Sequence, residues 1–160
     1  VKRQGALPFV RHHNIKYGGQ FPIWVAVELF TFGMLGSLFD LMRENDQRAV
    51  SREYNLSPES LSRLIASAVD VRNICAHYNR LYNRVLDDQP LLPNRLRLYE
   101  SDRLFPLLLA FAHVLGRERV LNRLITGLSL LEADFPEADL SLCGFPEDWR
   151  SILEAEAAQA

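Results

Sequence analysis

A long helical repeat between Pro58 and Val85 constrains the fold of this chain more than any other feature of its sequence. Apolar and aromatic side chains recur there at intervals of three and four residues, at Leu61, Leu64, Ile65, Ala68, Val71, Cys75, Tyr78, Tyr82 and Val85. This spacing predicts one amphipathic helix with a buried face. Its start is well marked, with Ser57 as the N-cap, Pro58 at the first helical position and Glu59 in the first turn.

The remaining segments also favour helices. Residues 22–44 are apolar on nearly all sides, which predicts a buried helix at the centre of the fold. Further helices are expected over residues 47–54, 102–115, 117–133 and a short stretch that opens at Gly144 to Trp149. No useful length of sequence alternates apolar and polar residues as a strand does. We therefore expect an all-α fold, a bundle of four to five main helices.

Composition limits the class of protein further. The 160 residues, 48% of them hydrophobic, suffice for a single domain over residues 1–160, with an alanine-rich tail at 156–160 that we expect to fray. The net charge of −2 gives no overall basic field, so any contact with nucleic acid must depend on local charge. Cys75 and Cys143 suggest neither a disulfide framework nor a zinc site, which favours a cytoplasmic protein without a metal or another cofactor.

One apolar stretch, residues 21–39, is nearly long enough to cross a bilayer of about 30 Å. Pro22 stands at its start and Glu28 near its middle, where a carboxylate in a membrane would be costly. We expect a buried helix and no membrane, although a membrane-associated helical protein is the alternative. A buried Glu28 requires a cationic partner, such as Arg72 or Arg11, and would thereby support the candidate site described next.

Arg72-Asn73-Ile74-Cys75-Ala76-His77 is the candidate functional centre. On the expected helix Asn73, His77, Arg80 and Arg84 share one face, because they are four, three and four residues apart. Histidine exchanges protons near neutral pH and can take one from a ribose 2′-hydroxyl, while an arginine such as Arg72 stabilises charge at the phosphate. This combination suits RNA cleavage without a metal. A satisfied, solvated polar face explains the same residue types.

A second cluster precedes the apolar stretch, at Arg11, His12, His13, Lys16 and Tyr17. Its donors and aromatic ring suit RNA phosphate and a stacked base, and a solvated face explains it equally well. Adjacent histidines point in different directions and make a poor metal pair, so no metal site is expected. Three further aromatic residues are expected to have structural roles. His113 is expected to be a core histidine with a backbone partner, and Trp24 and Trp149 are expected in the core or at an interface.

The spacing of Arg72 and His77 resembles the Arg-x4-to-6-His signature of HEPN domains, which are helical ribonucleases. The wider sequence, from about residue 9 to residue 149, resembles the Abi-like family of bacterial abortive-infection proteins. The segments that carry this resemblance are Phe-Val-Arg-His-His at 9–13, Pro-Ile-Trp-Val-Ala-Val-Glu at 22–28, Thr-Phe-Gly at 31–33, residues 71–84, and Gly-Phe-Pro-Glu-Asp-Trp at 144–149.

The resemblance implies a HEPN-like helical bundle that forms a homodimer, in which two Arg-x4-His motifs face one another as one endoribonuclease site. His77 would then be general base or acid, Arg72 would bind the scissile phosphate, and Asn73 would support them. RNA is the implied substrate, in phage defence or in a toxin–antitoxin pair with an antitoxin protein or RNA. A non-catalytic RNA- or protein-binding module of the same fold is the alternative. Family proteins usually carry a further N-terminal portion, which we expect this chain to lack.

Overall fold

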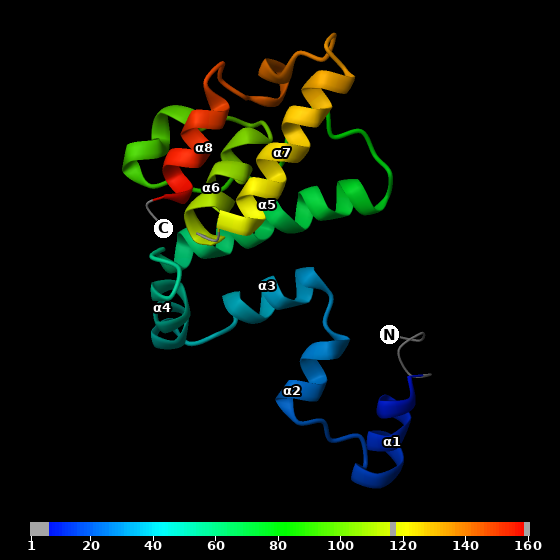
Figure 1. The fold of residues 1–160 in the computed structure, drawn as a ribbon. Coiled ribbons are helices and arrows are strands. Elements are labelled where there is room, and N and C mark those ends of the chain that lie inside the picture. The colour runs from blue at the N-terminus through cyan, green and yellow to red at the C-terminus, as the bar shows by residue number, and fades with distance from the viewer. Residues whose placement is uncertain (1–6, 116–117, 159–160) are drawn as a thin grey trace.

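The computed structural model describes residues 7–115 and 118–158. Within these ranges the chain is helical and has no strand, which confirms the prediction of an all-α fold (Figure 1). The helices are more numerous and shorter than expected. In chain order the elements are α1 (Pro8–Tyr17), α2 (Ile23–Ala26), the 3₁₀ helix η2 (Val27–Leu29), α3 (Phe32–Asp40), α4 (Glu44–Arg52), α5 (Pro58–Ala76), η3 (Asn94–Tyr99), α6 (Phe105–Leu115), α7 (Glu118–Asp134), η4 (Leu140–Cys143) and α8 (Trp149–Ala157).

Helix α5 is the long helix that the sequence predicts, and its N-terminus forms as expected. The Ser57 hydroxyl accepts a hydrogen bond from the backbone N–H of Ser60 at 3.0 Å, and Pro58 is the first helical residue. One side of α5 packs against α3, where a Cβ added at Gly36 would lie 3.0 Å from Cγ2 of Ile65. Glycine at this position therefore allows the two helices to approach closely. The other end of α5 differs from the prediction, as described below.

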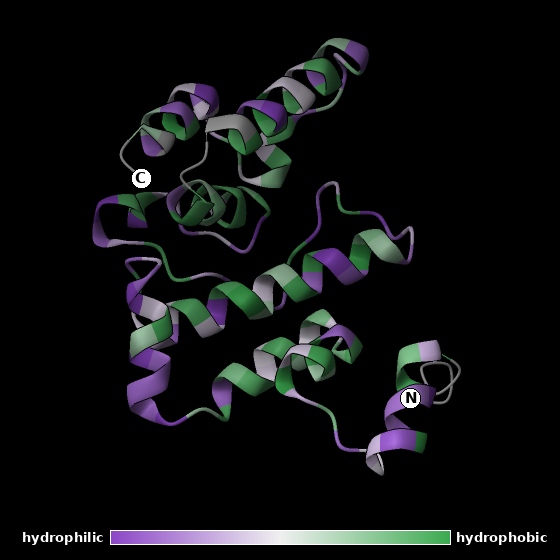
Figure 2. Ribbon diagram, turned by 60° about the horizontal axis from the view of Figure 1, so that its bottom comes forward, coloured by the Kyte–Doolittle hydropathy of each residue, from purple (hydrophilic) through white to green (hydrophobic). Residues whose placement is uncertain are grey.

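The hydrophobic core lies in the C-terminal half of the chain, around α6. Phe105, Leu107, Leu109 and Leu153 are fully buried, and α6 contacts α5, α7 and α8. Trp149, which was expected in the core or at an interface, is also buried here. Figure 2 shows the contrast between the hydrophobic interior helices and α4, which is hydrophilic along most of its length. The central helix of the fold is thus α6.

Residues 22–44 do not form the single buried helix that their apolar character predicts. The chain bends after η2, and Thr31 starts a new helix, since its hydroxyl accepts a hydrogen bond from the N–H of Met34 at 3.2 Å. This part of the chain lies at the edge of the molecule (Figure 1), and Trp24 is 72% exposed. Among the described residues, no helix combines the length and the apolarity needed to cross a membrane.

The C-terminal helix extends into the tail that was expected to fray. Helix α8 continues to Ala157, and Glu156, the first residue of the tail expected to fray, is buried. Residues 159–160 of that tail lie outside the described residues, as does residue 117, where the fourth long helix was expected to begin. A buried polar residue so near the chain end needs a partner, which is identified in the next section.

Candidate functional site

The candidate motif lies at the exposed C-terminal end of α5. The helix ends at Ala76 with His77 as its C-cap, and the backbone N–H of Tyr78 bonds to the carbonyl of Cys75 at 3.1 Å. The N–H of the next residue, Asn79, reaches back to the carbonyl of Ile74 at 3.0 Å. These two bonds form a Schellman motif, in which Tyr78 takes the left-handed position with φ of 56°. The motif therefore occupies a helix end rather than a helix interior.

Contacts with a distant segment hold the chain after this helix end. The hydroxyl of Tyr82 donates a hydrogen bond to the carbonyl of Asp139 at 3.2 Å and accepts one from the Asp139 N–H at 3.0 Å. The side chain of Arg103 donates to Oδ1 of Asn83 at 2.9 Å. The prediction that one helix runs to about Val85 is therefore wrong. Arg80 and Arg84 are exposed, but they lie beyond the helix and do not continue the face that carries His77.

Within the motif, Asn73 interacts with Arg72 and not with the histidine ring. Nη1 of Arg72 donates a hydrogen bond to Oδ1 of Asn73 at 3.0 Å, and both side chains are exposed. Arg72 forms no ion pair with a described residue, so its charge is available to an external anion. His77 is exposed, and its ring makes no hydrogen bond to any described residue. The expected support of His77 by Asn73 is thus absent within one chain.

The apolar face of α5 also differs in detail from the predicted repeat. Leu61, Leu64, Ala68 and Ile74 are buried, whereas Cys75 is exposed. Tyr78, which was expected on the apolar face, is 98% exposed because the helix has already ended.

Glu28 does not support the motif in the way the sequence suggests. Its side chain is exposed on η2 and pairs with no cation among the described residues. The carboxylates near the motif belong instead to a groove of about 350 Å³ between α3 and α5. Asp40, Asp70 and Asp88 line this groove together with Asn73. An acidic groove repels a polyanion, so RNA would have to approach the motif from another direction.

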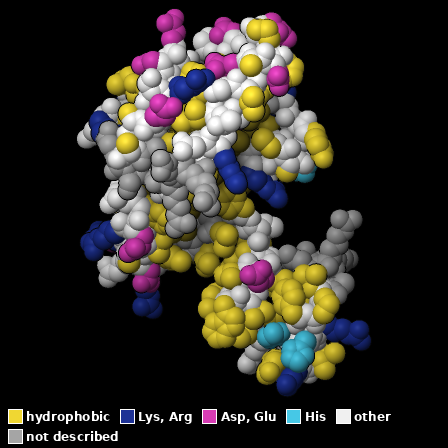
Figure 3. Space-filling view, in the orientation of Figure 1, with side chains coloured by type: hydrophobic (Ala, Val, Ile, Leu, Met, Phe, Trp, Pro, Cys, Tyr) yellow, Lys and Arg dark blue, Asp and Glu magenta, His cyan; other side chains and the backbone are white. Residues whose placement is uncertain are grey.

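The N-terminal cluster forms an aromatic cavity beside α1. Arg11, His12, His13, Lys16 and Tyr17 all lie on this helix. The ring of His13 stacks on Phe21 with centroids 5.1 Å apart, and His12 meets Tyr17 edge to face at 5.7 Å. The cavity has a volume of about 470 Å³, and its walls are His12, His13, Tyr17, Gln20, Phe21 and Pro22. Figure 3 shows histidine and basic side chains gathered on this N-terminal part of the molecule.

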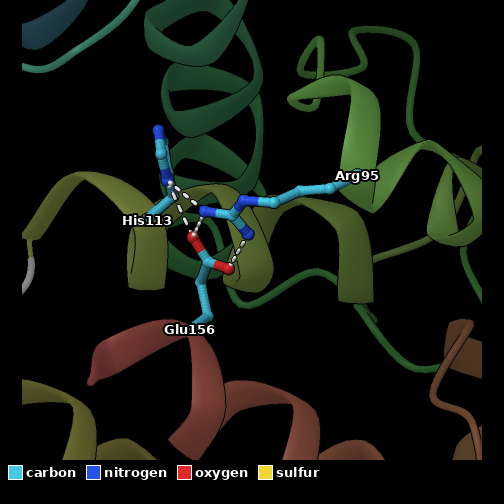
Figure 4. A network of polar contacts seen from close by, with 3 residues as sticks. All are labelled: Arg95, His113 and Glu156. Carbon is cyan, nitrogen blue, oxygen red and sulfur yellow. Dashed lines mark hydrogen bonds and ion pairs between the residues drawn. The ribbon is translucent and has the colours of Figure 1, made fainter. Parts of the chain in front are cut away.

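A polar cluster that the sequence did not predict joins Arg95 and His113 to the buried Glu156 (Figure 4). Nη2 of Arg95 donates to Oε1 of Glu156 at 2.7 Å, Nη1 bonds to Oε2, and Nδ1 of His113 lies 2.8 Å from Oε1. Burial raises the pKa of the Glu156 carboxyl, but hydrogen bonds and charge from Arg95 and His113 outweigh burial, and the net pKa is lowered. The carboxylate therefore stays ionised although it is buried.

Two signals in the sequence point to this cluster. Glu156 follows Trp149 and Leu153 at helical spacing, so it shares their buried face. His113 stands in an otherwise apolar helix, where it was expected to bond a backbone carbonyl; the carboxylate of Glu156 is its partner instead. The cluster joins α6, α8 and η3, so it links three elements of the fold.

Comparisons with known proteins place the chain in a family. A family model described as Abi-like protein matches residues 1–83, slightly more than half of the chain, and this match spans α1 to α5 with the Arg72–His77 motif. Searches of curated proteins and of solved structures each found no match. Among the described residues, no three histidine, cysteine, aspartate or glutamate side chains are grouped so as to hold a metal ion. The chain therefore belongs to the Abi-like family, which is associated with abortive infection, a form of defence against phage.

Proposed function

We propose that this chain is an endoribonuclease of phage defence or of a toxin–antitoxin pair, which cuts RNA without a metal ion through Arg72 and His77. The observation that carries this proposal is the state of the two side chains at the end of α5. Arg72 is exposed and has no ion-pair partner among the described residues, and the exposed His77 ring has no hydrogen-bond partner there. A phosphate can therefore meet a free cation and a free proton acceptor at one helix end.

The proposed reaction is an attack within the RNA chain. The ribose 2′-oxygen bonds to the adjacent phosphorus, and the bond from phosphorus to the 5′-oxygen breaks. His77 takes the proton from the 2′-hydroxyl, and a second acid donates a proton to the departing 5′-oxygen. Arg72 stabilises the charge that develops on the phosphoryl oxygens. The products are a 2′,3′-cyclic phosphate and a free 5′-hydroxyl.

The need for a second acid favours a homodimer. One copy of the motif supplies one histidine, whereas two copies facing one another supply both a base and an acid. The described residues include large exposed aromatic side chains, Tyr78 just after α5 at 98% and Trp24 on α2 at 72% exposure. Aromatic residues are enriched in protein interfaces, so such side chains suit a contact with a second copy. Asn73 would hold Arg72 in place for the composite site.

Cleavage of a labelled single-stranded RNA tests this proposal directly. We expect the parent chain to leave cyclic-phosphate ends with or without EDTA, and a substrate with 2′-deoxyribose throughout to stay intact. His77→Ala and Arg72→Ala should abolish cleavage while the thermal melting temperature is unchanged, since both side chains are exposed. Full activity of His77→Ala would refute the proposal. So would activity that EDTA removes and added metal restores.

A second candidate function is RNA binding without cleavage. It is favoured by one observation, that within a single chain Arg72 bonds Asn73 and neither bonds the His77 ring. In this case RNA binds and remains intact, and His77→Ala leaves the affinity unchanged. Arg80→Glu would weaken binding, because Arg80 is exposed close to the end of α5. The cleavage assay together with a binding assay separates the two functions.

A further inference from the structure

The N-terminal segment differs in charge from the rest of the chain. The first 27 residues contain four lysines and arginines and no aspartate or glutamate, although the whole chain has a net charge of −2. Arg11 and Lys16 are exposed on α1, and neither forms an ion pair with a described residue. The basic and histidine side chains of this region share one part of the surface in Figure 3. A local positive field attracts a polyanion even when the overall charge of the chain is negative.

The aromatic cavity beside α1 arises from a tight reversal of the chain. Gly18 and Gly19 have φ of 59° and 80°, in the left-handed region that glycine adopts without strain. The N–H of Gly19 bonds to the carbonyl of His13 at 3.2 Å, which closes the turn. The chain then returns along α1 and places Phe21 on the His13 ring, with an angle of 17° between the two planes.

The rings around this cavity are held in place but remain accessible. Nδ1 of His13 lies 2.9 Å from the carbonyl of Phe9, and a carbonyl only accepts, so Nδ1 carries a proton and this bond fixes the ring. Tyr17 is 48% exposed, and the ammonium group of Lys16 lies 5.5 Å from its ring centroid. The volume of about 470 Å³ falls within the range of about 300–1,000 Å³ typical of small-ligand pockets.

From these features we infer that the cavity beside α1 binds an unpaired base of single-stranded RNA, while Arg11 and Lys16 hold the adjoining phosphates. Stacking on an aromatic ring accepts any base, whereas a base inside a duplex is paired and cannot enter. In Figures 1 and 2, α1 lies on the same side of the molecule as the end of α5 that carries the motif. The inference rests on the proposed ribonuclease function and assigns its substrate class, single-stranded RNA.

Binding to an RNA that cannot be cleaved tests the inference separately from catalysis. The probe is a fluorescein-labelled oligonucleotide of about 12 nucleotides with 2′-O-methyl riboses, measured by fluorescence anisotropy. Tyr17→Ala should weaken binding about tenfold, because base–aromatic stacking contributes this much, and Tyr17→Phe should bind like the parent. Tyr54→Ala is the matched control, since Tyr54 is similarly exposed, at 41%, but follows α4. Lys16→Ala should reduce the slope of log Kd against log salt by about 0.7, and Arg52→Ala should not.

Several outcomes would overturn the inference. Equal affinity of the parent and Tyr17→Ala for the probe would show that no base stacks in the cavity. Equal affinity of the parent for the probe and for a duplex of the same length would show that the protein contacts only the phosphates. Absence of any probe binding would point to a protein partner instead. Since the probe lacks a free 2′-hydroxyl, none of these results depends on cleavage. If His77→Ala keeps full cleavage while Tyr17→Ala loses binding, the proposed catalytic role fails and the base site stands.

Discussion

Tyr78 stores strain at the end of α5. Its φ of 56° lies in the left-handed region, which costs a residue with a Cβ about 1–2 kcal/mol, and its 98% exposed ring gains little from packing in return. We expect Tyr78→Gly to raise the free energy of unfolding by roughly 0.5–1 kcal/mol, because the greater freedom of glycine in the unfolded chain offsets part of the relief. Urea denaturation measures this change.

Tyr78→Ala serves as the control for this prediction. Alanine keeps the Cβ and removes the ring, so its free energy of unfolding should stay close to that of the parent. If the glycine variant is no more stable than the alanine variant, the left-handed conformation at residue 78 does not limit stability.

At the scale of single residues, the sequence did not predict the structural setting of the motif. The residue types of Arg72 and His77 indicated an exposed polar site, and both are exposed. Residues 77–79, where the helix ends, include no glycine or proline, and the apolar spacing continues through Tyr82. Periodicity alone therefore favours a longer helix. After the helix end Tyr82 bonds to Asp139, and a contact across that sequence distance leaves no local signal.

Among the helices, α8 depends on its buried carboxylate. Glu156 is 2% exposed and bonds Arg95 on η3 and His113 on α6, so Glu156→Gln removes the charge that holds three elements together. We expect a loss of about 2 kcal/mol in unfolding free energy. This is below the roughly 3–5 kcal/mol for a fully buried pair, because Arg95 is half-exposed. Glu154→Gln, an exposed neighbour on α8, should leave stability unchanged.

The stabilisation that Glu156 provides should also depend on pH. The pKa of Glu156 is lowered in the folded chain from its ordinary value of 4.5, so its ionised form stabilises the fold above that pH and the stabilisation disappears as the pH falls through the folded pKa. The difference in unfolding free energy between the parent and Glu156→Gln should therefore have its largest value near neutral pH and should decrease below pH 4.5. Thermal melting across this range measures it. A difference that stays constant in acid would contradict an ionised Glu156.

The order of the helices was easier to predict than their burial. Residues 22–44 and α6 are both strongly apolar, and hydrophobicity does not distinguish the central helix from a helix at the edge. In the structure α6 is central, because α5, α7 and α8 all pack on it. The break at Thr31 was a readable N-cap signal that the apolar character of its neighbours concealed.

In the whole molecule, α5 belongs both to the main core, through Leu64, and to the candidate site, through the motif at its C-terminal end. The main core is formed by residues from Leu64 onward and centres on α6, whereas the family match covers residues 1–83, with the aromatic cavity and the motif. The N-terminal helices α1 and α2 carry large exposed side chains such as Ile23 and Trp24. Exposed side chains of this kind suit a contact with a second copy of the chain, and the dimer remains a prediction.

Mixing active and inactive chains tests whether the site is shared between two copies. If base and acid come from the two His77 residues of a dimer, equal amounts of parent and His77→Ala with free exchange leave about a quarter of the dimers intact. The initial cleavage rate per total chain should then fall to about a quarter, whereas independent subunits would retain about half. Mixing the parent with Glu154→Gln should cause no loss. Retention of half the rate, or full activity of a monomer isolated by size-exclusion chromatography, would contradict the shared site, because each copy would then provide both its own base and its own acid.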